Sequence, residues 1–432
     1  MISLLCVSRR RSLLLVSLLV IILISSLLVG ISMSDDSEVS LENAIHVKNE
    51  TELRNAINNA PIGKPTTITL DNDITLTSTT DDHNSNYLSV NVIIPADKDI
   101  TLTSNKNNGY YKLNGAANGT ILCVANDAIL RIDGITITRT SNTVGGGVSV
   151  NGRFSKFYLY NGIISGHKGY HGCGVDTNGM FVMSGGTISG NTGEWGGGVY
   201  NSGTFMMSGG TISDNTSKGG GGGVSNSGLV TFVMSGGTIS GNTAEGHGGG
   251  VVIGFGEFTM SGGEISKNKT AQRGGGVYNG AKITLSGGKI SGNTANLGGG
   301  VYNSYVFTMS GGEITRNTAT LGGGVYDNSK GLIRQGGVIS GNTATNDGND
   351  VYPVGSGDGS SDGNDGASNG NNNNGSSGDN DGGASSSDHF SLRDIVIACV
   401  ITIVVVLCIV TVVLLVSFQK KIIIIREKPS NS

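Results

Sequence analysis

The stretch GGGVYNSGTFMMSGGTISDNT, residues 196–216, decides the fold, because close variants of it recur about seven times between Gly145 and Thr345. The valine that follows each glycine cluster measures the period, and successive valines are 24 to 27 residues apart. Repeats of this length are typical of solenoids. Glycine pairs cut each unit into pieces too short for a helix, and leucine is nearly absent from the units, so helical and leucine-rich repeats are excluded. The period-marking valines are Val148, Val175, Val199, Val224, Val251, Val277, Val301, Val325 and Val351.

Each unit carries three short apolar clusters, which predict three short strands per turn. The first holds the valine, and the second alternates apolar and outward residues, as in Phe181 and Met183. The third holds one isoleucine. Stacking like residues along one axis predicts an all-β, right-handed parallel β-helix over residues 65–352, the hand following the usual crossover preference. The isoleucine series is Ile188, Ile212, Ile239, Ile265, Ile290, Ile314 and Ile339.

The polar residues of the repeat fit the same stack. We expect the GGG and SGG glycines where the backbone turns through positive φ or approaches the next coil. One asparagine recurs at a single turn position, where we expect left-handed backbone and a ladder of amides bonded along the axis. These ladder asparagines are Asn191, Asn215, Asn242, Asn268, Asn293, Asn317 and Asn342.

The segment before the repeats predicts a cap. Residues 49–60, NETELRNAINNA, have the pattern of a short amphipathic helix. We expect Asn49 to cap its first turn, Glu52 to reach back as in a capping box, and Leu53 and Ile57 to face inward. Because solenoid ends need a polar cover, residues 35–64 are interpreted as an N-terminal cap region.

The two ends of the chain predict a membrane topology. Residues 1–34 combine a basic head with an apolar run, which is typical of a signal peptide or an uncleaved N-terminal anchor. Residues 395–418 are apolar and uncharged over the length of a membrane span, which predicts a transmembrane helix at 394–418, and the basic tail 419–432 after it is expected in the cytoplasm. Residues 353–393 are rich in Gly, Ser, Asn and Asp, which predicts a disordered linker. Residues of about 35–394 are therefore expected outside the cell.

The composition limits the kinds of molecule that the protein can bind. The chain has 432 residues, 73 of them glycine, with 28 Lys+Arg against 32 Asp+Glu and a net charge of −4. Without a basic surplus, nucleic acid is excluded as a partner.

Cysteine and histidine give a weak metal signal. Cys123 and Cys173 are two repeats apart, beyond disulfide reach in a stack, and we expect both to be small buried side chains. His167, His171 and Cys173 are suitable metal ligands by type. They occupy a turn and have no accompanying ligand pair, so we expect a solvated loop and neither a metal nor another cofactor.

Aromatic residues provide the candidate ligand face. Tyr170 and Trp195 lie in equivalent turns of adjacent units and are candidates for an aromatic patch that contacts sugar rings. Four outward tyrosines follow the period-marking valines and either extend this face or pack beside neighbouring coils. They are Tyr200, Tyr278, Tyr302 and Tyr326.

The motifs GGGVYNSG, FTMSGGEI and ISGNTA resemble those of the adhesin-like, pectin-lyase-type β-helix surface proteins of methanogenic archaea and some bacteria. The glycine-rich units are also similar to polymorphic outer-membrane protein repeats. The resemblance covers about residues 45–352 and implies a right-handed β-helix at the cell surface. It is weakly informative about activity. Bacterial autotransporter relatives end in an outer-membrane barrel, whereas this chain ends in one apolar segment.

Three functions follow as hypotheses. The first is a membrane-anchored, single-pass surface protein of adhesin-like type, without enzymatic activity, that contacts glycans or surface proteins of other cells. The second is a polysaccharide lyase or hydrolase on the same scaffold, and the third is a passive envelope component. Such enzymes use two or three carboxylates. Here Glu264 and Glu313 share a register with Lys289 between them, a pattern that favours a surface charge ladder over a catalytic pair.

Overall fold

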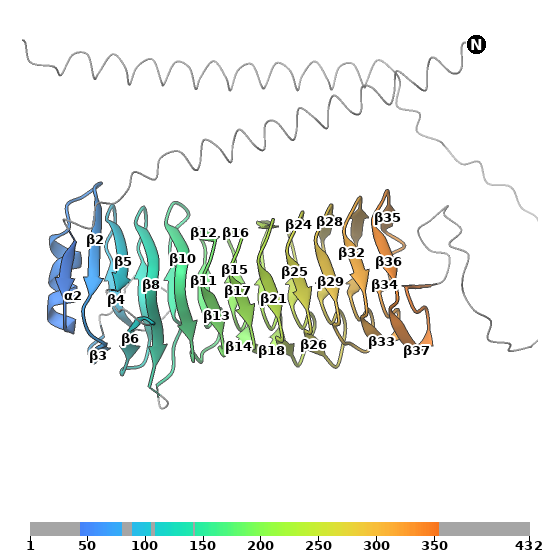
Figure 1. Ribbon diagram of the computed structural model, residues 1–432, viewed down its shortest axis with the longest axis horizontal. Coiled ribbons are helices and arrows are strands. Elements are labelled where there is room, and N and C mark those ends of the chain that lie inside the picture. The colour runs from blue at the N-terminus through green and yellow to red at the C-terminus, as the bar shows by residue number, and fades with distance from the viewer. Residues whose placement is uncertain (1–43, 80–88, 105–108, 141–142, 354–432) are drawn as a thin grey trace, which may run out of the picture. The chain divides into compact units, whose positions relative to one another are not determined.

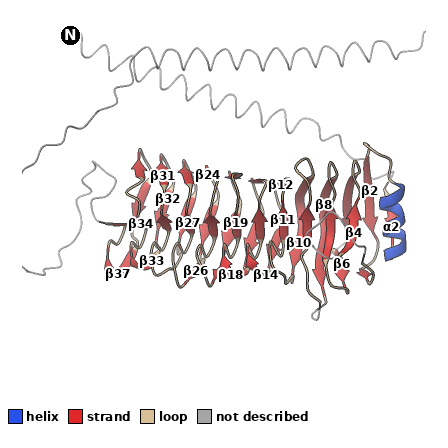
Figure 2. Ribbon diagram, turned by 180° about the vertical axis from the view of Figure 1, so that it is seen from behind, coloured by secondary structure: helices blue, strands red, loops and turns tan. Residues whose placement is uncertain are grey.

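The computed structural model describes residues 44–79, 89–104, 109–140 and 143–353 (Figure 1). These residues form an all-β parallel solenoid of the right-handed type with about 11 turns, which confirms the predicted fold class. Every pairing between its named strands is parallel, and strands of equivalent position line up in rows along one axis (Figure 2).

The period-marking valines stack in register. Val148 pairs with Val175, Val175 with Val199, and the series continues without a shift to Val351. Their side chains point into the solenoid, and those of the internal coils are almost fully buried. The resulting 11-stranded sheet, here called the valine sheet, consists of β4 (Val90–Ile94), β7 (Thr120–Val124), β9 (Val148–Val150), β11 (Val175–Thr177), β15 (Val199–Asn201), β19 (Val224–Asn226), β23 (Val251–Ile253), β27 (Val277–Asn279), β30 (Val301–Asn303), β34 (Val325–Asp327) and β38 (Val351–Tyr352).

The phenylalanine and isoleucine series also stack as predicted. Phe181, Phe205 and Phe232 lie face to face with ring centroids 4.8 and 4.7 Å apart, and the isoleucines pair in register from Ile188 onward. The phenylalanine strands are β12 (Met180–Met183), β16 (Thr204–Met207), β20 (Thr231–Met234), β24 (Glu257–Met260), β28 (Lys282–Leu285), β31 (Val306–Met309) and β35 (Leu332–Arg334). The isoleucine strands are β13 (Thr187–Ser189), β17 (Thr211–Ser213), β21 (Thr238–Ser240), β25 (Glu264–Ser266), β29 (Lys289–Ser291), β32 (Glu313–Thr315) and β36 (Val338–Ser340).

The coil begins before the clear repeats, with strands that pair ahead of Gly145. Strands β8 and β10 are long and run through the position of the later SGG turn, so they join the phenylalanine and isoleucine rows into one sheet. Strand β1 lies within the region interpreted as a cap, yet it pairs with β2, so the solenoid starts ahead of residue 65. These strands are β1 (Ile45–Val47), β2 (Pro65–Leu70), β3 (Ile74–Leu76), β5 (Asp99–Ser104), β6 (Tyr111–Gly115), β8 (Ile129–Arg139) and β10 (Lys156–Ser165).

A fourth short strand in many of the coils corrects the prediction of three. It follows the ladder asparagine and is easily missed because it turns only one small residue inward, such as Ala244 or Ala319. The fourth strands are β14 (Thr192–Trp195), β18 (Thr216–Gly220), β22 (Thr243–Ala244), β26 (Lys269–Thr270), β33 (Thr318–Leu321) and β37 (Thr343–Asp347).

The seven ladder asparagines are buried inside the coil and bonded along the axis. Asn242 is representative: its Nδ2 donates to Oδ1 of Asn268 at 2.9 Å and to the Ile212 carbonyl at 3.0 Å. Its Oδ1 accepts from the backbone N–H and from Nδ2 of Asn215, both at 3.0 Å. All four hydrogen bonds are buried, and an unpaired amide is costly at a buried position.

The expectation of left-handed backbone at these asparagines is wrong by one residue. The positive φ belongs to the residue before each asparagine, for example Gly190 at +64°, Asp214 at +55° and Lys267 at +57°. This preceding residue makes the turn, which leaves the asparagine free to point inward. Glycine and larger residues alternate at the turn position, so three coils carry the steric cost of a side chain there.

Both ends of the ladder have a polar partner. At the first coil, the backbone N–H of His167 donates to Oδ1 of Asn191 at 3.1 Å. At the last coil, Asp350 accepts from the backbone N–H and Nδ2 of Asn342, at 3.1 and 2.9 Å. The bonds from one ladder asparagine to the next all run from Nδ2 to Oδ1 in the C-terminal direction, so a carboxylate terminates the row where donors remain.

Glycines make the close contacts between coils. A Cβ on Gly198 would lie 2.6 Å from the Gly223 carbonyl oxygen of the next coil, nearer than real Cβ atoms approach. Gly196 opens the same cluster at φ +60°. The GGG motif therefore serves both expected purposes, a turn and a close approach.

Helix α2 (Glu50–Asn59) matches the predicted amphipathic helix and lies at the N-terminal end of the stack (Figure 1). Asn49 is its N-cap and accepts from the Glu52 N–H at 2.9 Å. Glu52 bonds the Lys48 N–H at 2.7 Å, so the reciprocal bond is one residue earlier than in a standard capping box. Leu53 and Ile57 are buried as expected.

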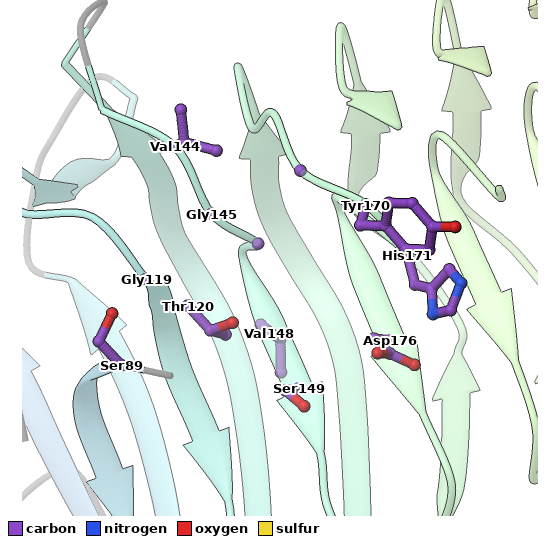
Figure 3. Close-up of a pocket in the computed structure, with 13 residues that line it drawn as sticks. Ser89, Gly119, Thr120, Val144, Gly145, Val148, Ser149, Tyr170, His171 and Asp176 are labelled. Carbon is purple, nitrogen blue, oxygen red and sulfur yellow. The ribbon is translucent and has the colours of Figure 1, made fainter. Parts of the chain in front are cut away.

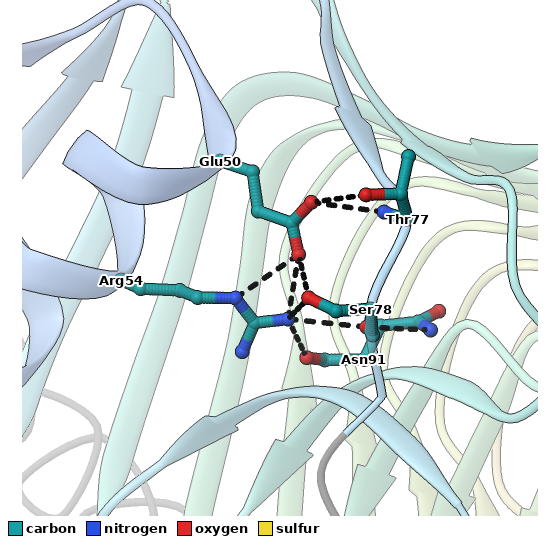
Figure 4. A network of polar contacts seen from close by, with 5 residues as sticks. All are labelled: Glu50, Arg54, Thr77, Ser78 and Asn91. Atoms are coloured by element: carbon teal, nitrogen blue, oxygen red, sulfur yellow. Dashed lines mark hydrogen bonds and ion pairs between the residues drawn. The ribbon is translucent and has the colours of Figure 1, made fainter.

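A polar network joins α2 to the first coils (Figure 4). Glu50 accepts from the Thr77 N–H at 2.9 Å, from the Ser78 hydroxyl and from Arg54 at 2.7 Å, and Arg54 also donates to the Asn91 carbonyl at 2.6 Å. Burial alone raises the pKa of Glu50, but the hydrogen bonds from Ser78, Thr77 and Arg54 outweigh it and lower the pKa to about 2. Glu50 is therefore ionised at neutral pH.

Several predicted segments lie outside the described residues: the N-terminal segment, most of the linker, the predicted transmembrane helix at 394–418 and the predicted cytoplasmic tail. Among the residues that are described, no helix has the length and apolar character needed to cross a membrane.

Candidate functional site

The outer surface of the valine sheet carries one continuous row of side chains. The residue after each valine points outward, and these residues pair in register from coil to coil. In chain order the row reads Ser149, Asp176, Tyr200, Ser225, Val252, Tyr278, Tyr302, Tyr326 and Tyr352. Its first part is polar and its last part is aromatic.

The last part is a stack of tyrosines. Tyr278, Tyr302, Tyr326 and Tyr352 lie ring over ring with centroids 5.4, 5.2 and 5.1 Å apart. Because each ring covers its neighbour, the flat faces that a sugar would stack on are already used. Tyr302 exposes only 3% of its surface, so the expectation that it presents a ligand face is wrong. Packing beside neighbouring coils, the alternative interpretation, describes these tyrosines.

The candidate residues near the start of the row form a different, exposed cluster. Tyr170 is 64% exposed and Trp195 is 41% exposed. His171 lies between aromatic neighbours, with its ring 4.6 Å from that of Tyr170 and stacked at 4.5 Å on that of Tyr200. The backbones of His171 and Trp195 are bridge partners on adjacent coils. We call Tyr170, His171, Trp195 and Tyr200 the aromatic cluster.

Two glycines in the next coil leave room for the Trp195 ring. A Cβ on Gly219 would lie 2.7 Å from the Trp195 ring, and one on Gly220 would lie 3.4 Å from it. The indole therefore lies along the surface of the next coil. Sequence predicted that Tyr170 and Trp195 occupy equivalent turns, and in the structure they do lie on adjacent coils.

Next to the aromatic cluster the valine sheet has a cavity of about 270 Å³ (Figure 3). Its polar side chains include Thr120, Ser149 and Asp176, which come from the neighbouring strands β7, β9 and β11 and are each less than a tenth exposed. Tyr170 and His171 line it as well, and glycine backbone completes it. Among the lining residues Asp176 is the only acid, and none is lysine or arginine.

A buried cation lies beneath the glycine backbone of the cavity. All five N–H groups of Arg139 have acceptors: the carbonyl oxygens of Ala117, Gly119 and Gly146, the Thr143 hydroxyl and Nδ1 of His167. Burial lowers the pKa of Arg139 to about 10, so it remains charged at neutral pH. Arg139 fixes the backbone of the cavity and has no donor left for a ligand.

The expected solvated loop is wrong, because the side chain of His167 is fully buried. Cys173 is fully buried too, which agrees with the separate expectation that both cysteines are small buried side chains. His167 occupies the ladder position of its coil, and its Nε2 lies 3.1 Å from the Ile137 carbonyl. Burial, reinforced by the charge of Arg139, lowers the pKa of His167 to about 3, so its ring is neutral. With Nδ1 accepting from Arg139, the ring proton is assigned to Nε2.

Burial has the same kind of effect on Cys173. Burial raises the pKa of the Cys173 thiol to about 12, which disfavours the thiolate that a metal requires. Cys123 and Cys173 are both buried and unbridged, as expected. Within the described ranges, no group of three or more His, Cys, Asp or Glu side chains is arranged to hold a metal ion.

The acidic ladder of the repeat also follows its predicted register. Glu264 pairs with Lys289, and Lys289 with Glu313, on strands β25, β29 and β32. The Glu264 carboxylate accepts from the Ser291 hydroxyl at 3.0 Å. Lys289 therefore lies on the coil between those of Glu264 and Glu313, so the two glutamates are two coils apart.

Sequence reasoning missed Asp176 and Arg139. Asp176 was marked by the motif VDT at a position where three other coils read VYN, so an acid stands in the outward row where those coils carry tyrosine. Arg139 gave no signal, because it is the last residue of a strand and its hydrogen-bond partners include the carbonyl oxygens of Ala117, Gly119 and Gly146, which lie on two separate segments.

Comparisons with family models, with curated proteins and with solved structures found no match to this chain. The functional argument therefore depends on the residues themselves.

Proposed function

We propose that this protein is a membrane-anchored, adhesin-like cell-surface protein that presents its solenoid for contact with glycans. The anchoring part of the proposal is supported by the sequence alone: an apolar N-terminal segment, a Gly/Ser/Asn/Asp-rich linker at 353–393 and an uncharged apolar run at 395–418 followed by basic residues. The resemblance of the repeat motifs to adhesin-like surface proteins supports it further.

One observation carries the glycan contact. A cavity with buried hydroxyl and carboxyl side chains adjoins exposed aromatic rings at Tyr170 and Trp195. Aromatic faces and hydroxyl-bonding groups are the two features that a sugar ring needs from a protein, since its C–H face is apolar and its edge is polar. Both lie on coils whose strands pair in register, which holds them in place.

Helix α2 is proposed as the cap of the solenoid. It covers apolar side chains of the first coils with Leu53, Ala56 and Ile57, and the Glu50 network ties it to residues 77, 78 and 91. Without a cover, the first coil would expose backbone groups and core side chains to solvent.

A glycan-binding screen tests the function. Full-length protein, purified in a detergent without a sugar headgroup, is applied to an array of neutral and acidic glycans. We expect saturable binding that Trp195→Ala and Tyr170→Ala weaken about threefold to tenfold, the range of one lost aromatic contact. Tyr305→Ala is the matched control, because Tyr305 is an exposed aromatic residue on a distant coil.

Two results would overturn the proposal. Binding that survives both substitutions would show that the aromatic cluster is not the contact surface, and absence of binding to every glycan would favour a passive envelope component. Release of unsaturated or reducing sugars from a polysaccharide, abolished by Asp176→Ala, would instead favour the enzyme hypothesis.

A further inference from the structure

The loops that join each valine strand to the next phenylalanine strand form one edge of the solenoid. Where the repeat is regular these loops are short, as at residues 202–203 between β15 and β16. Four of the loops carry a large apolar side chain that is exposed to solvent: Phe154, Leu229, Phe255 and Tyr305. In solenoids, insertions in single repeats map to loops on one face, which is often the binding face. We call residues 151–156, 227–231, 254–257, 280–282, 304–306 and 328–331 the loop edge.

Leu229 and Phe255 lie at the centre of the loop edge. Thr231 and Glu257, which follow their loops, are register partners on β20 and β24, so the two loops lie on adjacent coils. Leu229 is 92% exposed and Phe255 is 62% exposed. A single exposed apolar residue is common on a protein surface, but large ones on adjacent coils favour a contact surface.

The charged residues of the loop edge are mainly basic. Four basic side chains accompany one acid, Glu257, whose carboxylate lies 2.7 Å from Nζ of Lys282. The edge therefore has an excess of three positive charges, four minus one, although the whole chain has a net charge of −4. Asp327 adjoins the edge but is buried, and its carboxylate accepts from Nδ2 of Asn303 at 2.8 Å. The other basic residues are exposed and have no ion-pair partner among the residues that the structure describes: Arg153, Lys156 and Lys330.

Apolar side chains together with lysine and arginine match the surface of an anionic membrane. Large apolar side chains enter the headgroup region there, and acidic lipids attract each basic residue. A second copy of this chain matches the loop edge less well, because two such edges placed together would bring like charges into contact. The charge of the edge therefore favours acidic lipid over a copy of the protein.

The parallel valine strands separate the loop edge from the aromatic cluster. Each of these strands begins after a glycine cluster and ends at a loop of the edge, so Trp195 precedes β15 and residues 202–203 follow it. With the loop edge on a membrane, the aromatic cluster would therefore be turned away from the lipid. The predicted linker, residues 353–393, is long enough for this orientation, because a flexible chain of about 40 residues spans roughly 30–40 Å.

We propose that the loop edge contacts the acidic lipid headgroups of the membrane in which the protein is anchored. Leu229 and Phe255 enter the headgroup region, and Arg153, Lys156 and Lys330 bind the acidic headgroups. The solenoid then lies along the membrane and presents the aromatic cluster outward. This inference rests on the anchoring part of the proposed function and adds a second membrane contact to it.

Fluorescence quenching on the full-length protein in lipid vesicles tests the contact. Leu229→Cys is labelled with the fluorophore NBD after the native cysteines are changed to alanine. Thr243→Cys is the matched control, because Thr243 is exposed on the fourth strand of the same coil. Lipids with a nitroxide on the headgroup are the quencher, in phosphatidylcholine vesicles with or without phosphatidylglycerol. With phosphatidylglycerol present, we expect the Leu229 label to be quenched about threefold or more strongly than the Thr243 label.

Charge reversal distinguishes attraction to lipid from mere tethering by the anchor. Each basic residue near an anionic surface contributes about fivefold to binding, so Arg153→Glu with Lys156→Glu should reduce quenching of the Leu229 label about threefold or more. Leaving out phosphatidylglycerol should have the same effect. Lys168→Glu with Lys218→Glu changes the net charge equally at exposed lysines in the row of fourth strands, and it should leave the quenching unaltered.

The outcomes separate this inference from the function on which it depends. Equal quenching of the two labels overturns the inference, and so does quenching that responds neither to phosphatidylglycerol nor to the charge reversal at Arg153 and Lys156. A Leu229 label with blue-shifted emission that lipid nitroxides do not quench would indicate a protein at the edge and would also overturn it. In these cases the proposed function stands, provided that the protein resists extraction from the vesicles by alkaline carbonate. Release by carbonate overturns the anchor and the inference together.

Discussion

Replacing one ladder asparagine by alanine should destabilise the solenoid more than any surface change. Asn242 is in the middle of the ladder, and Asn242→Ala removes four buried hydrogen bonds. At a net contribution of about 1 kcal/mol for each bond, the expected loss is about 4 kcal/mol. The Asn215 N–H and the Ile212 carbonyl lose partners that water cannot replace in the dry interior.

The loss should be local as well as large. Each coil contacts mainly its two neighbours, so we expect faster hydrogen exchange in the coils that contain Asn215, Asn242 and Asn268 before the rest of the solenoid. Urea unfolding of the full-length protein gives the total change, and hydrogen exchange read by mass spectrometry locates it.

Two matched variants complete the design. Asn178→Ala changes an exposed asparagine whose side chain is outside the ladder and should cost less than about 0.5 kcal/mol. Asn242→Asp keeps the acceptor but presents a carboxylate to Oδ1 of Asn268 and to the Ile212 carbonyl, so it should be at least as damaging as alanine. A loss below about 1 kcal/mol for Asn242→Ala would refute the view that the ladder stabilises the stack.

Further predictions concern the turn, the ladder start and the helix. At the turn before the ladder, Gly190→Ala should destabilise the fold by about 1 kcal/mol, because φ is +64° there; a new Cβ would meet no atom within 4 Å, so the backbone conformation alone accounts for the loss. Lys267→Gly, at φ +57°, should stabilise the fold by about 0.5 kcal/mol for the same reason. Urea unfolding measures both changes, and changes of the same sign would contradict the reasoning. The pKa of His167 is lowered in the folded protein, so the unfolded chain binds a proton more readily and the stability of the unchanged protein falls as pH falls from 6.5 toward 3. His167→Asn removes this histidine and should make the protein more resistant to acid. If the variant loses as much stability between pH 7 and pH 4 as the unchanged protein does, the reasoning is wrong. The pKa of Glu50 is also lowered, so its contribution is complete above its unfolded pKa and is lost as pH falls from 4.5 toward 2; Glu50→Gln should remove this acid dependence, as thermal unfolding against pH would record.

The repeat made most of the fold predictable, because the same residues face the same neighbours in every coil. Val148 through Val351, the phenylalanines and the isoleucines all pair as their spacing indicated. The fourth strand was not predicted, because a strand with a single inward alanine shows no alternation of apolar and polar residues in the sequence. The left-handed residue was misplaced by one because Asp214 and Lys267 mask the glycine pattern at that turn.

The candidate site was less predictable, because it lies where the repeat is broken. Tyr170 and Trp195 were identified from their equivalent turns, but Tyr302 was not distinguishable from them by sequence, since burial there comes from rings stacked on both sides. His167 was misread because a histidine in a turn gives no sign that it replaces an inward asparagine. The cavity itself joins residues up to 87 positions apart, from Ser89 to Asp176, which only the stacking brings together.

The most direct test of the account measures distance along the axis. Nitroxide labels are attached to cysteines introduced at outward register positions, with the native cysteines changed to alanine. Thr187 is labelled together with either Lys289 or Val338, and both pairs are read by double electron–electron resonance. Register pairing places them four and six coils apart, or about 19 and 29 Å at a spacing of about 4.8 Å per coil. Two narrow distributions that differ by about 10 Å are expected. Broad distributions, or equal mean distances for the two pairs, would contradict the in-register stack on which the site depends.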